Sequence, residues 1–96
     1  MTFYRKSPIT VEAVQVRGLG DGSLEFSERH AWVNEALARH HTDTGSISEG
    51  APGSFEVLTD DGVKVAVRND WIIRDGAGRL DVLKSNEFPV IYEPVR

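Results

Sequence analysis

Hydrophobic and polar residues alternate along much of the second half of the chain. The stretches SFEVLT and VKVAVR flank a polar DDG, in which Gly62 can take the positive φ that a tight hairpin requires. Because an alternation of period two is typical of strands with one buried face, we predict a hairpin with its tip at Asp61 and Gly62. Three residues of the second strand are expected to face the core, namely Val63, Val65 and Val67, while Lys64, Ala66 and Arg68 face outward.

Further short runs predict additional strands. After the hairpin come WIIR, the turn DGAG, the run RLDVLK, a polar SNEF turn and a final PVIYEPV. Near the start, ITVEAVQV over residues 9–16 is rich in β-branched residues and lies between Pro8 and the glycine-rich GLGDG, which favours another strand. Consecutive hairpins at this spacing favour a curved antiparallel sheet or a small, partly open β-barrel.

One segment has the pattern of a helix. Residues 27–40, SERHAWVNEALARH, contain no glycine or proline, and Ser27 is a suitable N-cap. The helix would cover one face or end of the sheet, so the predicted class is α+β. The following residues, 41–54, are rich in Gly, Ser, Thr and Pro and predict a flexible loop. The predicted core consists of Trp32, Leu37, Phe55, Val57, Val65, Val67, Trp71, Ile73, Leu80 and Val82.

Composition limits the class of protein. A chain of 96 residues fits one domain, residues 1–96, and its 40% hydrophobic and 27% charged content is typical of soluble globular proteins. The N-terminus lacks the apolar run of a signal peptide, and no run is long enough to span a membrane. With no cysteine, the chain suits a reducing intracellular compartment. The net charge of −4 argues against nucleic acid as a partner, because DNA affinity depends on Lys and Arg.

The segment RNDWIIR is the main candidate for a binding site. Trp71 between Arg68 and Arg74 would suit a nucleotide, with stacking on the ring and the guanidiniums on the phosphate. The alternative is a structural corner, in which Trp71 packs inward and Asp70 bonds to backbone amides of the turn. We favour the corner. Two further cations, Arg5 and Lys6, precede the first strand and complete the set of candidate ligand-binding residues.

The sequence carries no signature of catalysis or metal binding. His30, His40 and His41 do not have the spacing of metal ligands on a helix, and the acidic residues have turn or capping explanations. Nucleophile and nucleotide-fold motifs are absent from the sequence, since GLGDG lacks the third spaced glycine and the βαβ unit. We therefore predict a protein that is not an enzyme and needs no cofactor.

Three ordered motifs carry a resemblance to a known group of proteins. YRKSPITVEAVQV at the start, NDWIIRDGAGRLDVLKSNEF in the centre and YEPV at the end resemble a family of small, uncharacterised bacteriophage and prophage proteins. This sequence has Asn69 where the family tends to have Gly, and residues 42–54 have no counterpart in it. The resemblance implies a phage origin and a shared fold. It implies no catalytic residues.

Two functions remain as hypotheses. In the first, the protein is a phage accessory factor in the host cell cytoplasm that binds a host protein or sequesters a small anionic ligand such as a nucleotide. In the second, it is a virion component, a minor capsid or tail accessory that assembles through a sheet edge or the termini. A homo-oligomer is compatible with both. We favour the first because the chain lacks the long arms and coiled-coil segments of many lattice proteins.

Overall fold

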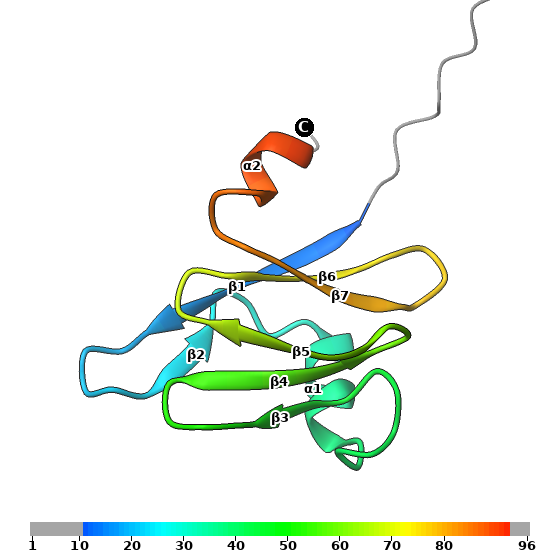
Figure 1. Cartoon of the computed structure of the whole chain (residues 1–96), viewed down its shortest axis with the longest axis horizontal. Coiled ribbons are helices and arrows are strands. Elements are labelled where there is room, and N and C mark those ends of the chain that lie inside the picture. Colours follow the sequence, from blue (N-terminus) through cyan, green and yellow to red (C-terminus); the bar gives the residue numbers. More distant parts are fainter. Residues whose placement is uncertain (1–10, 93–96) are drawn as a thin grey trace, which may run out of the picture.

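A computed structural model describes residues 11–92, which form two antiparallel sheets and two short helices (Figure 1). In chain order the elements are β1 (Glu12–Gly18), β2 (Leu24–Phe26), α1 (Ala31–Ala38), β3 (Ile47–Glu49), β4 (Ser54–Thr59), β5 (Gly62–Val67), β6 (Trp71–Arg74), β7 (Leu80–Leu83) and α2 (Phe88–Ile91). The sheet orders are β2-β1-β6-β7 and β3-β4-β5. The predicted α+β class with curved antiparallel sheet is confirmed, and within the described residues the sheets do not close into a barrel.

The core lies where the two sheets and α1 meet. In the four-stranded sheet Val14 and Ile72 are Cα partners, and both are fully buried. In the three-stranded sheet Val57 is fully buried, and β7 packs beside β4 and β5. Of the predicted core, Trp32, Phe55, Val57 and Leu80 belong to the core cluster, while Leu37 and Val82 are half-buried and pack against it. Ile73 is buried but lies outside the cluster, on the face of β6 opposite Ile72.

The predicted β4–β5 hairpin forms, with its turn one residue earlier than the predicted tip at Asp61 and Gly62. Gly62 has a φ of 103° and is the Cα partner of Thr59, so Asp60 and Asp61 make the turn between them. The Thr59 hydroxyl donates to the carbonyl of Gly62 at 2.8 Å and accepts from the amide of Asp61 at 3.1 Å. The need for a left-handed residue at position 62 explains why the sequence places glycine there.

The two faces of β5 are the reverse of the prediction. Ala66 is fully buried, whereas Val63, Val65 and Val67 are 59%, 46% and 41% exposed. The expectation that the valines face the core was therefore wrong. The Cα partner of Ala66 is Phe55, whose ring stacks on Phe26 with 4.7 Å between centroids. These two aromatic rings fill the space beneath β5, so a small side chain fits there.

The helix is shorter than predicted, because its expected N-cap belongs to a sheet. α1 begins at Ala31, after His30 as N-cap, and not at Ser27. The amide of Ser27 donates to the carbonyl of Gln15 at 2.8 Å, and the Ser27 hydroxyl accepts from the amide of Gln15 at 2.9 Å. Ser27 thus continues the pairing of β2 with β1, a strand that the sequence pattern did not reveal.

Two other segments differ from the prediction. Residues 41–54, predicted as a loop, contain β3, whose Ile47 is buried and pairs with Val57. A strand of three residues is too short to show an alternation of polar and apolar positions.

The predicted final strand PVIYEPV is instead α2 over its first part, with Pro89 in the first turn, where its missing N–H has no cost. Residues 93–96 lie outside the described residues.

Candidate functional site

The segment between β5 and β6 is a tight turn, as the corner interpretation requires. The amide of Asp70 donates to the carbonyl of Val67 at 2.9 Å and closes the turn. Asn69 has a φ of 76° and is the only non-glycine residue with positive φ in residues 11–92. The carboxylate of Asp70, a residue only 3% exposed, accepts a hydrogen bond from the amide of Val67 at 3.0 Å. The prediction that Asp70 bonds to backbone amides of the turn is confirmed.

Trp71 lies on the outer face of the four-stranded sheet. Its neighbour Ile72 is fully buried in the core, and successive side chains of a strand point to opposite faces. Trp71 is half-buried, and its ring stacks on Phe88 of α2 with 4.0 Å between centroids and 11° between planes. The prediction that Trp71 joins the main core was wrong. One face of its ring is already covered by another aromatic ring.

The two arginines that bracket Trp71 in the sequence lie far apart. A Cβ placed on Gly18 would lie 3.0 Å from Cδ of Arg68, so that side chain lies against the end of β1. Arg74 is the Cα partner of Glu12, at the start of β1. β1 is seven residues long, so its two ends lie about 20 Å apart at roughly 3.3 Å per residue.

The three predicted binding residues within residues 11–92 therefore do not assemble into one site. Ile72 and Arg74 are two positions apart along β6 and therefore share a face. Arg74 thus points to the side of the sheet opposite Trp71. Arg5 and Lys6 lie outside the described residues. Of the three candidates that the structure describes, Arg74 alone lines a cavity near the helix.

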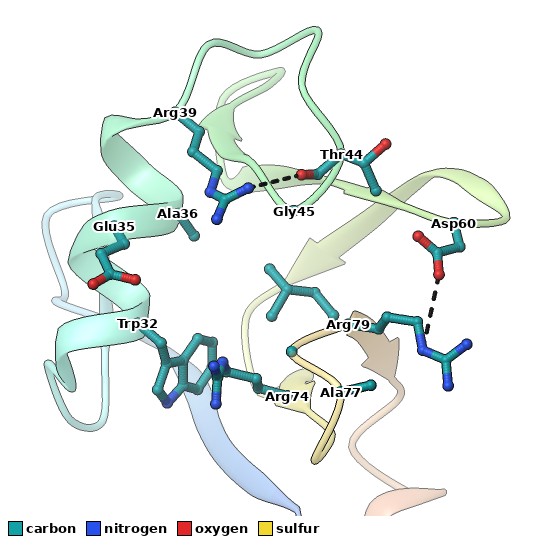
Figure 2. Close-up of a pocket in the computed structure, with 12 residues that line it drawn as sticks. Trp32, Glu35, Ala36, Arg39, Thr44, Gly45, Asp60, Arg74, Ala77 and Arg79 are labelled. Carbon is teal, nitrogen blue, oxygen red and sulfur yellow. Dashed lines mark hydrogen bonds and ion pairs between the residues drawn. The ribbon is translucent and has the colours of Figure 1, made fainter.

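That cavity is a groove of about 400 Å³ between α1 and the β6–β7 hairpin (Figure 2). Arg39 reaches into it from the end of α1, and Arg74 lies beside Trp32 on the hairpin side. Arg79 and Asp60 form its other end. The volume is within the range of about 300–1,000 Å³ that is usual for small-molecule sites. We treat this groove, hereafter the arginine groove, as the candidate site.

Arg79 is held in place by its own hairpin. Its Nε lies 3.2 Å from Oδ2 of Asp75 and 3.9 Å from Oδ2 of Asp60. The other carboxylate oxygen of Asp75 accepts from the amides of Arg79 and Ala77, both at 2.9 Å. The hydrogen bond from the Arg79 amide is the main reason why the pKa of Asp75 lies below its ordinary value. Much of the charge of Arg79 is thus matched by carboxylates.

Arg39 and Arg74 are less engaged. Arg39 donates from Nη1 to the carbonyl of Thr44 at 3.3 Å, which uses one of its five N–H donors. Nη1 of Arg74 lies 3.9 Å from Oε1 of Glu12, and within residues 11–92 its side chain donates no hydrogen bond. Most donors of these two guanidiniums are therefore available to a ligand.

The inner wall of the groove is apolar. Trp32 is 8% exposed, and Ala36 and Leu80 are buried beside it. The indole Nε1 of Trp32 is buried and has no hydrogen-bond partner in the described part of the chain. Because so little of the Trp32 ring is exposed, the groove offers no broad aromatic face for stacking.

Arginines outnumber carboxylates in the lining of the groove, although the protein is acidic. Its charged lining consists of Arg39, Arg74 and Arg79 against Glu35 and Asp60. The chain as a whole has a net charge of −4. Arginines gathered in a groove can attract a small anion, whereas the acidic surface of the rest of the protein disfavours the extended backbone of nucleic acids, whose affinity depends on broad basic surfaces.

The histidines are engaged with local partners. Nε2 of His30 lies 2.9 Å from Oε2 of Glu28, and Nδ1 of His40 lies 2.6 Å from the hydroxyl of Thr42. The rings of His40 and His41 lie 4.4 Å apart. In residues 11–92 no group of three or more acidic, histidine or cysteine side chains could hold a metal ion.

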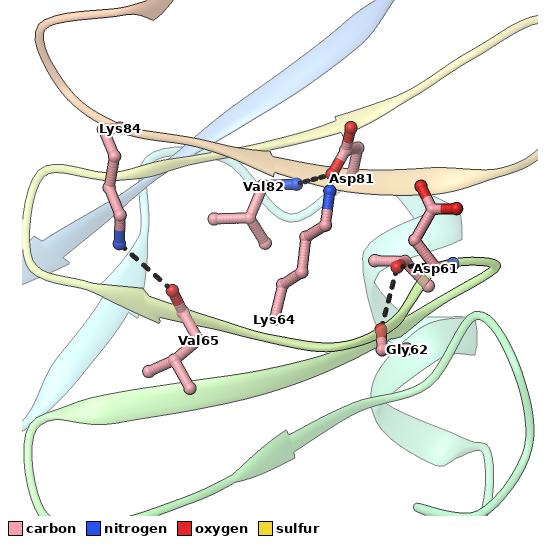
Figure 3. Close-up of polar contacts among 8 residues, drawn as sticks. Asp61, Gly62, Lys64, Val65, Asp81, Val82 and Lys84 are labelled. Carbon is pink, nitrogen blue, oxygen red and sulfur yellow. Dashed lines mark hydrogen bonds and ion pairs between the residues drawn. The ribbon is translucent and has the colours of Figure 1, made fainter.

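A second polar cluster joins the two sheets (Figure 3). Lys64 of β5 bonds to the carboxylate of Asp81 of β7, and this bond is the main reason why the pKa of Lys64 is raised. Lys84, just after β7, donates to Oδ2 of Asp70 at 3.1 Å and to the carbonyl of Val65 at 3.4 Å. Side chains therefore connect β5 to β7, which belong to different sheets. These contacts hold the fold together and leave few donors for a ligand.

The sequence analysis missed most of the arginine groove. Trp32 was predicted as core, which is correct, but Arg39 and Arg79 were not singled out. Arg79 stands four residues after Asp75 in the DGAG turn, a spacing that gives only a local ion pair. Nothing in the sequence places Arg39 opposite the hairpin, because their proximity depends on how α1 packs against the sheets.

Comparison of the chain with protein-family models, with curated proteins and with solved structures finds no match. None of the helices in residues 11–92 has the length and apolar character needed to cross a bilayer.

Proposed function

We propose that this protein is a phage-encoded accessory protein that binds a small anionic ligand in the infected bacterial cell, without catalysing a reaction. The observation that supports the proposal is the arginine groove, which gathers Arg39, Arg74 and Arg79 on a chain of net charge −4. Guanidinium forks bind carboxylates and phosphates through paired hydrogen bonds. A nucleotide is one member of this ligand class.

The lining of the groove supports binding in preference to catalysis. Its charged side chains are arginines and two carboxylates, and no histidine lies among the described residues that line it. The carboxylate of Asp60 is directed to Arg79. Such a site attracts and orients an anion but provides no nucleophile paired with a base.

The proposed source and cellular location rest on the sequence motifs alone. The segments around Trp71 and at both ends of the chain resemble small phage proteins, and the absence of cysteine suits the host cytoplasm. A phage protein that sequesters a small anion would act by stoichiometry, so its intracellular concentration would have to approach that of the ligand.

Isothermal titration against inorganic phosphate and a panel of linear and cyclic nucleotides tests the proposal. We expect at least one anion to bind, and the separate changes Arg39→Gln and Arg74→Gln to weaken that binding at least tenfold, because each removes one fork of donors. Arg68→Gln is the matched control, since Arg68 lies against Gly18 and outside the groove. No heat with any anion would refute the proposal. Loss of binding only in Arg68→Gln would instead place the site near Trp71.

The exposed valines of β5 favour a second candidate function, a minor capsid or tail accessory in the virion. Val63, Val65 and Val67 form a row on the outer face of the three-stranded sheet. In a particle this row would contact a neighbouring subunit, which would remove its apolar surface from water. Mass spectrometry of purified particles separates the two functions: the accessory protein would be absent from them, and the virion component present in a constant ratio to the capsid protein.

A further inference from the structure

The two least engaged arginines of the groove come from different elements. Arg39 extends from the end of α1, and Arg74 from the end of β6 (Figure 2). Arg79, in contrast, is bound by Asp75 and Asp60. A ligand that enters the groove therefore meets one free guanidinium on each wall.

Both guanidiniums lie against glycines, so no side chain shields them on that side. A Cβ at Gly45 would be 3.5 Å from Nη1 of Arg39, and one at Gly78 would be 3.6 Å from Nη2 of Arg74. The two glycines have φ values of 89° and 83°, which other residues rarely adopt. Each guanidinium is thus positioned against the backbone of a glycine in a left-handed conformation.

Two guanidinium forks suit a phosphate monoester better than a carboxylate. A carboxylate offers two oxygens and one negative charge, and one bidentate fork engages both oxygens, whereas a phosphate monoester has three terminal oxygens and a charge near −2 at neutral pH. A cyclic phosphodiester has one negative charge and two free oxygens. We propose that the groove binds the terminal phosphate of a small phosphomonoester between Arg39 and Arg74. This inference rests on the proposed function and specifies its ligand class.

The rest of the groove indicates what kind of molecule carries the phosphate. Glu35 lines it without an ion-pair partner in residues 11–92, so it would repel further negative charge and accept hydrogen bonds from hydroxyl groups. Trp32 is too deeply buried to stack on a base. A phosphate carried by a neutral group with several hydroxyls, such as a sugar, therefore fits the groove better than a ligand that is recognised through a nucleobase.

The test compares ligands that differ in one feature at a time. Ribose 5-phosphate, AMP, 3′,5′-cyclic AMP, succinate and a phosphoserine pentapeptide are titrated into the full chain by calorimetry, with amide NMR spectra to locate the shifts. We expect ribose 5-phosphate and AMP to bind within about threefold of each other. We expect cyclic AMP and succinate to bind at least tenfold more weakly.

Variants separate the geometry of the fork from its charge. Arg39→Lys and Arg74→Lys keep the charge but lose the paired donors, and each is expected to weaken ribose 5-phosphate at least fivefold. Arg68→Lys lies outside the groove and should bind like the parent. Amide spectra of each variant confirm that it is folded before its affinity is compared.

Each contrary outcome has a distinct meaning. If cyclic AMP or succinate binds as tightly as ribose 5-phosphate, and binding still depends on Arg39, the phosphomonoester inference is wrong while the anion groove stands. If AMP binds much more tightly than ribose 5-phosphate, the base is recognised and the sugar-phosphate inference is wrong. If the phosphoserine peptide binds more tightly than either, the assignment of a small-molecule ligand is wrong. If neither inorganic phosphate nor any anion of the panel binds, the proposed function itself is wrong.

Discussion

The burial of Ile72 gives the sharpest test of how the sheets face each other. Ile72 is fully buried, pairs with Val14 and Val82, and belongs to the main core. In Ile72→Ala, removal of three carbon atoms at about 0.8 kcal/mol each costs about 2.4 kcal/mol. The cavity that remains raises the expected loss to about 3–4 kcal/mol. For a domain of this size, such a loss lowers the melting temperature by roughly 12–30 °C.

Urea unfolding followed by the fluorescence of Trp32 and Trp71 measures the change, with circular dichroism as a second probe. Val65→Ala is the matched control, because Val65 is 46% exposed on a neighbouring strand. We expect Val65→Ala to cost less than about 1 kcal/mol, since about half of its side chain already contacts water. If Val65→Ala is as costly as Ile72→Ala, the valine row of β5 faces the core and the assignment of faces is wrong.

Two further predictions concern turns. Gly62→Val should destabilise the fold by about 1 kcal/mol or more, because φ is 103° at position 62. An added Cβ there would meet no atom within 4 Å, so backbone strain is the main effect tested. Unchanged stability in urea would contradict that conformation. Asp75→Asn should lower the melting temperature by more at pH 6 than at pH 3. The pKa of Asp75 is lowered in the folded protein, so the ionised carboxylate stabilises the fold at pH values above the ordinary pKa of 3.8. That stabilisation is lost as the pH falls through the pKa of the folded state. An effect of equal size at both pH values would show that the charge is not involved.

Local patterns predicted the turns and most strands well. A glycine with positive φ between two alternating runs specifies a hairpin, and Asp70 after Asn69 specifies a corner, because both depend only on residues a few positions apart. The faces of β5 could not be obtained in this way. Alternation shows that two faces exist, but the choice of the inward face depended on Phe55, which occupies the space opposite Ala66.

The candidate site was beyond the reach of sequence patterns for a related reason. Trp71, Arg68 and Arg74 are neighbours in the sequence, yet a strand places adjacent side chains on opposite faces and distant ones at opposite ends. The groove instead combines Arg39, at the end of α1, with the β6–β7 hairpin. The three strands β3, β4 and β5 lie between them in the chain. Only the packing of α1 against the sheets brings them together.

The sheet orders also determine how this protein can associate with other chains. The outermost strands, β2 and β3, have three residues each, about 10 Å of backbone, and the facing edges of β5 and β7 are occupied by lysine side chains that reach across between them. Long unpaired edges promote strand addition and aggregation, whereas edges this short, or covered by charged groups, resist both. An extended peptide would therefore find little backbone at the sheet edges in residues 11–92 with which to form a new strand.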